Sequence, residues 1–181
     1  MLIARSSPEC RLYMDLHACS CGETGFEAGH VLREDPEGRL VAVYRGNCPR
    51  CGLPRQFTFA LDEAVPPPPP AFGGPAASRI ICPGEFLLVA DQAASSVPLV
   101  PEHSIDPERA AHARIALATA VAAVEEVLKF IPEGASSVPE EAVTSQAGRT
   151  AYAREPGRFS RARLEATIAA HRAALAARIP A

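Results

Sequence analysis

Two pairs of closely spaced cysteines constrain the fold of this 181-residue chain more than any other feature. The first pair lies in Cys19-Ser20-Cys21-Gly22 and the second in Cys48-Pro49-Arg50-Cys51-Gly52. A structural zinc ion prefers four soft ligands in a tetrahedron, and two tight turns that each present two thiolates meet that demand. The sequence therefore predicts one metal site, with the ligands Cys19, Cys21, Cys48 and Cys51.

Two alternatives to this ligand set stay open. His17 lies two residues before Cys19 and could replace one of the cysteines, since imidazole is also a common zinc ligand. The other alternative is that the cysteines bind no metal at all.

The predicted zinc ion is structural rather than catalytic. Catalytic zinc sites keep an open position for water, whereas four thiolates close the coordination shell. The zinc deaminase pattern, His-x-Glu followed by Pro-Cys-x-x-Cys, is also incomplete, because Asn47 precedes Cys48 and no glutamate follows His30 at the required place. With no Ser–His–Asp arrangement and no Gly-rich phosphate loop either, we expect a protein that is not an enzyme.

Composition divides the chain into three regions and predicts an α+β fold. The predicted parts are a β domain over residues 1–65, a proline- and glycine-rich linker over 66–77, and an α-helical domain over 78–181. Apolar alternation and turn residues predict strands over 26–33, 39–44 and 56–61. The five prolines from Pro66 to Pro70 predict an extended, stiff spacer.

The helical region has clear start signals. Asp106 is a good N-cap and Pro107 suits the first helical position, and the apolar spacing that follows predicts a helix that ends before Pro132. Two further helices are predicted over residues 83–93 and 160–178.

Residues 17–61, with two cysteine turns flanking a potential hairpin, resemble a zinc ribbon. In that family two such turns clamp the metal and three strands form the sheet. The chain departs from the family in its first pair, which has one intervening residue where zinc ribbons usually have two. Whether the exposed edge of the ribbon pairs with a second copy is left open by the sequence.

The third region is similar to a group of small bacterial proteins of toxin–immunity loci, over residues 72–165. The resemblance depends on four stretches, namely 72–75, 83–91, 126–132 and 156–164. The resemblance implies a stoichiometric inhibitor that binds a toxin domain. It assigns no binding or catalytic residues to this chain. A protein partner, such as a toxin domain, is therefore the first expectation for function.

A nucleic-acid-binding or transcription-associated accessory protein is the alternative. Zinc ribbons occur in transcription machinery, and five arginines with interleaved Tyr152 and Phe159 could contact phosphates and bases: Arg149, Arg154, Arg158, Arg161 and Arg163. The same arginines could instead form internal ion pairs. The net charge of −3 makes the chain as a whole a poor match for a polyanion.

The remaining features predict a cytoplasmic protein. The chain has no apolar run long enough for a membrane span, and its N-terminus lacks the apolar run of a signal peptide. In a reducing compartment the six cysteines are metal ligands or buried thiols rather than disulfides. Cys10 and Cys82 are expected as buried small apolar side chains, although a nucleophilic or redox role for Cys82 stays open.

Overall fold

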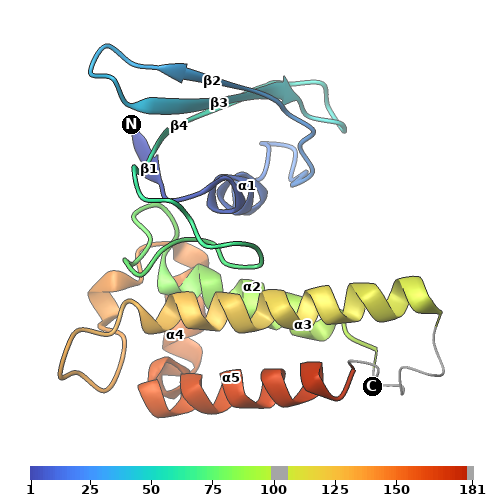
Figure 1. Ribbon diagram of the computed structural model, residues 1–181, viewed down its shortest axis with the longest axis vertical. Helices are drawn as coiled ribbons and strands as arrows, with labels where there is room; N and C mark the ends of the chain where they lie inside the picture. The colour runs from blue at the N-terminus through green and yellow to red at the C-terminus, as the bar shows by residue number, and fades with distance from the viewer. Residues whose placement is uncertain (99–105, 179–181) are drawn as a thin grey trace. The chain divides into compact units, whose positions relative to one another are not determined.

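A computed structural model describes residues 1–98 and 106–178. The contacts divide the described chain into two compact units, drawn in Figure 1. The first unit comprises residues 1–74 and 78–81, and the second comprises the rest of the described chain. The fold class is α+β, as predicted: strands lie in the N-terminal part and helices dominate the C-terminal part.

A four-stranded sheet forms the first unit, in the order β1-β4-β3-β2. The strands are β1 (Leu2–Ala4), β2 (Gly29–Glu34), β3 (Leu40–Asn47) and β4 (Pro54–Leu61). β2, β3 and β4 are antiparallel neighbours and correspond to the three predicted strands, whereas β1 adds a parallel partner to β4. The sheet is therefore larger than the three-stranded sheet expected for a zinc ribbon.

Helix α1 (Ser7–Leu16), which is not among the elements predicted from the sequence, packs on one face of this sheet (Figure 1). Its start signal is present in the sequence, because the Ser6 side chain accepts a hydrogen bond from the backbone N–H of Glu9 at 3.0 Å. Side chains from the helix and from the inner face of the sheet form one apolar core: Ala4, Cys10, Met14, Ala42, Tyr44 and Phe59.

The turn between β2 and β3 is tightly organised. The Asp35 carboxylate accepts hydrogen bonds from the backbone N–H groups of Glu37 and Arg39, at 3.0 and 2.9 Å. The Arg39 side chain also donates to it at 2.8 Å. These backbone and side-chain contacts lower the pKa of Asp35 and fix the pairing of the two strands.

The proline-rich segment does not form one continuous rod. The backbone N–H of Ala71 donates to the Pro68 carbonyl at 3.3 Å, so the chain turns within the run of prolines. Phe72 then becomes buried, and its carbonyl accepts a hydrogen bond from the Ser6 hydroxyl. The segment predicted as a spacer thus belongs in part to the first unit, which extends to Gly74 and includes the buried Phe72.

The second unit is helical: α2 (Pro83–Ser95), α3 (Pro107–Leu128), α4 (Gln146–Arg154) and α5 (Arg161–Ala176), with short 3-10 turns at Glu140–Ala142 and Pro156–Phe159. α3 packs against α2 and runs beside α5 (Figure 1). The predicted cap is present, since the Asp106 carboxylate accepts from the Arg109 backbone at 2.9 Å. None of the described helices is both long and apolar enough to cross a membrane.

Candidate metal centre

The first cysteine turn follows α1 directly. The backbone N–H of Cys19 donates to the Glu23 carbonyl, and that of Gly22 donates to the Cys19 carbonyl, both at 2.8 Å. Gly22 has a φ of +85°, in the left-handed region that glycine adopts most readily. This turn directs the side chains of Cys19 and Cys21 toward the second cysteine pair.

The second turn connects β3 to β4. The Cys48 backbone N–H donates to the Leu53 carbonyl and the Gly52 backbone N–H donates to the Cys48 carbonyl, both at 2.9 Å. Gly52 has a φ of +73°, so it repeats the backbone conformation of Gly22. Both turns therefore need glycine for the same steric reason.

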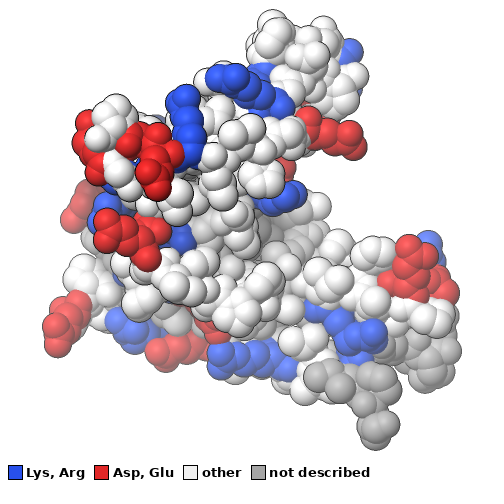
Figure 2. Space-filling view, turned by 45° about the horizontal axis from the view of Figure 1, so that its top comes forward, with Lys and Arg blue, Asp and Glu red and all other residues white. Residues whose placement is uncertain are grey.

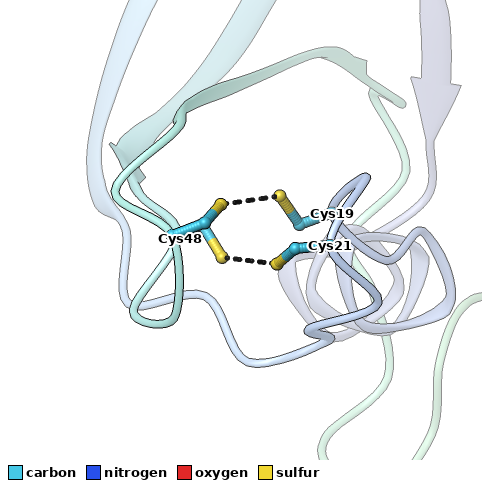
Figure 3. Close-up of side chains that lie close together, drawn as sticks. Cys19, Cys21 and Cys48 are labelled. Atoms are coloured by element: carbon cyan, nitrogen blue, oxygen red, sulfur yellow. Dashed lines mark hydrogen bonds between the residues drawn. The ribbon is translucent and has the colours of Figure 1, made fainter.

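The four predicted ligands converge on one point. The Sγ atoms of Cys19 and Cys51 are 3.6 Å apart, as are those of Cys21 and Cys48, and all four lie within 4.8 Å of one another. Figure 3 shows Cys19 and Cys21 facing Cys48 across this point. Tetrahedral zinc with Zn–S bonds near 2.3 Å separates its sulfurs by about 3.8 Å. The donor set and its spacing fit a four-coordinate metal ion.

Backbone N–H groups and the neighbouring sulfurs shift the pKa values of Cys19, Cys48 and Cys51 in different directions. The backbone N–H of Cys21 lowers the pKa of Cys19 to about 6. Burial opposes ionisation of Cys48, but the backbone N–H groups of Cys51 and Arg50 outweigh it and lower that pKa as well. Cys51 accepts from the backbone of Leu53, yet the adjacent Cys21 and Cys48 raise its pKa to about 12.

His17 is held away from the metal site. Its Nδ1 lies 2.7 Å from the Tyr13 carbonyl, and its ring stacks on the Tyr13 ring with centroids 3.8 Å apart. Among the residues that the structure describes, the metal-ligand cluster consists of the four cysteines alone. The geometry favours the four-cysteine set over the set that includes His17.

Two arginines that the sequence analysis did not single out support the first turn. Arg50 donates to the Cys21 carbonyl at 3.2 Å, and Arg55 donates to the carbonyl of His17. The Arg55 guanidinium also lies over two aromatic rings, 4.8 Å from the centroid of Phe26 and 5.1 Å from that of Phe57. Arg55 thereby connects the first turn to β4. No sequence pattern predicts that Arg55 connects these segments, because the contact depends on the pairing of distant parts of the chain.

The remaining cysteines are buried, as expected. Cys10 lies in the core of the first unit, and burial raises its pKa to about 12. Cys82 is the N-cap of α2, and its Sγ lies 3.2 Å from the Ser145 hydroxyl. Cys10 thus packs in the core, whereas Cys82 lies at the start of α2 and contacts Ser145, the N-cap residue of α4.

The predicted arginine cluster is only partly available at the surface. Arg158 forms a two-point ion pair with Asp91, at 2.6 and 2.9 Å, and Arg149 donates to the Thr144 carbonyl.

Phe159 is fully buried and packs against Tyr152, with ring centroids 4.8 Å apart, so it offers no surface for a base to stack on. Arg154 and Arg163 are exposed. On the described part of the face drawn in Figure 2, acidic and basic side chains are interspersed.

Comparison with known proteins gives no relative for this chain. No protein-family model, no curated protein and no solved structure matches it. The resemblance of residues 72–165 to proteins of toxin–immunity loci therefore has no support from a family match, and the functional argument depends on the site alone.

Proposed function

We propose that the chain is a non-enzymatic zinc protein that binds a protein partner. The observation that carries the proposal is the cluster of four cysteine sulfurs, all within 4.8 Å of one another. A set of four thiolates suits Zn²⁺ and leaves no coordination position for a substrate. The metal would hold two backbone turns together and so stabilise the surface around them.

A protein partner fits this proposal better than a nucleic acid does. The net charge is −3, and a zinc ion with four thiolates adds a local charge of −2, which disfavours binding to phosphates. As the specific partner we propose a toxin domain, which the chain would bind and inhibit; this part depends only on the resemblance of residues 72–165. The proposal includes a reducing, cytoplasmic location, where thiolates stay available to the metal.

Metal analysis tests the first part of the proposal. Protein purified without added metal should contain close to one zinc per chain and should be colourless, because iron in a four-sulfur site absorbs visible light. The buried ligand variant Cys48→Ser should lose the metal, whereas the matched variant Cys82→Ser, also buried, should retain it. Equal zinc content in the two variants would refute the assignment of the site.

A pull-down from native lysate tests the second part. The zinc-loaded chain, with Cys48→Ser as the control, is used at low and moderate salt with and without nuclease. One stoichiometric protein that survives salt and nuclease and is lost with the control variant would support a partner role, and a toxin domain would support inhibition. Material that disappears with salt or nuclease would favour the nucleic-acid alternative.

A further inference from the structure

The two edges of the sheet in the first unit differ in their capacity to pair with another strand. β1 ends the sheet on one side with only three residues. β2 ends it on the other side with six residues, and among the described residues no strand covers its outer edge. Alternate N–H and C=O groups along an edge strand point away from its neighbour and can bond to an added strand.

β2 carries the charged residues Arg33 and Glu34 but lacks a bulge and a proline, two other features that usually protect an edge. Its pairing with β3 is continuous from Gly29 opposite Arg45 to Glu34 opposite Leu40, without a bulge, and it contains no proline. All six of its residues are exposed. Two of them are large and apolar, Val31 with 64% and Leu32 with 54% of its surface accessible. A regular, exposed, apolar edge of this kind favours pairing with another strand.

We propose that this edge pairs with β2 of a second copy of the chain, in antiparallel orientation and with the two-fold axis at Leu32. In this register Leu32 lies opposite its own copy, and Val31 lies opposite Arg33. His30 then lies opposite Glu34, twice by symmetry. The strand is thus complementary to itself, with an apolar pair in the centre and an imidazole–carboxylate pair on each side.

Neighbouring antiparallel registers lack this match. Moving the two-fold axis by one residue, to Val31, places His30 opposite Leu32, and moving it the other way, to Arg33, places Leu32 opposite Glu34. Either shift leaves Glu34 without the imidazole. The register is therefore specified by the sequence of β2 itself, as the residues opposite one another always share a face of the sheet.

The edge is also preorganised. His30 stacks on the buried ring of Tyr44 with centroids 5.6 Å apart, and the hydrogen-bonded turn at Asp35 fixes the end of the strand. Because β2 is already extended and paired on one side, little conformational freedom is lost on association. The added strand would extend the four-stranded sheet across the two-fold axis into a continuous one.

Sedimentation equilibrium of the zinc-loaded full chain over a wide concentration range tests this inference. We expect a monomer–dimer equilibrium that Leu32→Lys weakens by at least about tenfold, because it places two lysines opposite each other. Ile115→Lys is the matched control, since Ile115 is also a large apolar residue, with 62% of its surface accessible, but lies in α3 and away from the cysteine turns. A chain that is monomeric at all concentrations, or a dimer weakened equally by both variants, would overturn the proposal.

A charge exchange tests the register. His30→Glu or Glu34→His alone should weaken the dimer, because each destroys the opposed pair, whereas the double variant should restore it, because the pair is reformed in reverse. Failure of the double variant to recover would rule out the two-fold at Leu32. Zinc content is measured on every variant, so a monomer with bound zinc would contradict this inference alone and leave the proposed metal site intact.

Discussion

The carboxylate of Glu9 and the guanidinium of Arg5 form a buried ion pair, with Glu9 Oε1 and Arg5 Nη2 2.6 Å apart. The same carboxylate accepts the backbone N–H of Arg5 at 2.6 Å, so one side chain joins β1 to the first turn of α1. Glu9 has no accessible surface, and Arg5 has 6%. A charge at this depth is tolerated only with its partner in place.

Removal of the Glu9 charge should therefore destabilise the first unit strongly. Glu9→Gln keeps the shape of the side chain but removes the negative charge that faces the buried Arg5 guanidinium, and we expect a loss of about 3–5 kcal/mol in the free energy of unfolding. Urea denaturation of the zinc-loaded chain measures it. The exposed Glu63→Gln provides the control, with a change within about 0.5 kcal/mol. Equal stability of the two variants would contradict the buried pair.

Because the Cys10 thiol is buried, we expect the first unit to lose stability at alkaline pH. Burial raises its pKa from 9.0 to about 12, so the folded state resists ionisation that the unfolded state undergoes. This contribution to stability is complete below pH 9 and is lost as the pH rises from 9 toward about 12. The melting temperature of the zinc-loaded chain should fall over this range. In Cys10→Ala the melting temperature should fall less over this pH range, even though that variant has a lower melting temperature at neutral pH.

Contact between α2 and α4 requires glycine at Gly84. A Cβ atom at this position would lie 2.4 Å from the Cα of Gly148, which is backbone and cannot swing aside. Gly84→Ala should therefore cost about 1–3 kcal/mol, through separation of the two helices. Gly157→Ala is the matched control, because a Cβ there meets nothing within 4 Å. Thermal unfolding of both variants tests the difference, and a neutral Gly84→Ala would show that the helices are less closely packed.

Chelation of the metal should loosen one unit and spare the other. The four ligands lie in the first unit, beside the ends of α1, β3 and β4, whereas α3 belongs to the second unit. With a strong chelator, amide exchange in β3 and β4 should accelerate by more than about tenfold. Exchange in α3 should stay unchanged, and added zinc should reverse the effect. Equal acceleration in β4 and α3 would show instead that the metal controls the whole chain.

The local signals in the sequence are sufficient to predict the cluster of four cysteines and most of the helices and strands. Cys-x-Cys and Cys-x-x-Cys with following glycines identify the four cysteines that lie together, and the capping pattern at Asp106 locates the start of α3. Helix α1 is absent from the predicted elements, although Ser6 and Glu9 form a recognisable start signal, because the whole of residues 1–65 is predicted as a β domain.

The remaining features depend on contacts between distant segments. β1 has only three residues, and nothing within them indicates a parallel pairing with β4. The role of Arg55 follows from the approach of His17, Phe26 and Phe57 to one point, which periodicity does not reveal. The turn within the prolines likewise depends on the burial of Phe72 beside Ser6.

The two short sulfur–sulfur distances join residues far apart along the chain. Cys19 and Cys51 are 32 positions apart, and Cys21 and Cys48 are 27 apart. A metal ion bound there closes loops of this length, and so removes conformational entropy from the unfolded chain as a disulfide does. Unlike a disulfide, this cross-link forms without an oxidant and opens when zinc is scarce. The stability of the first unit would then follow the free zinc concentration of its surroundings.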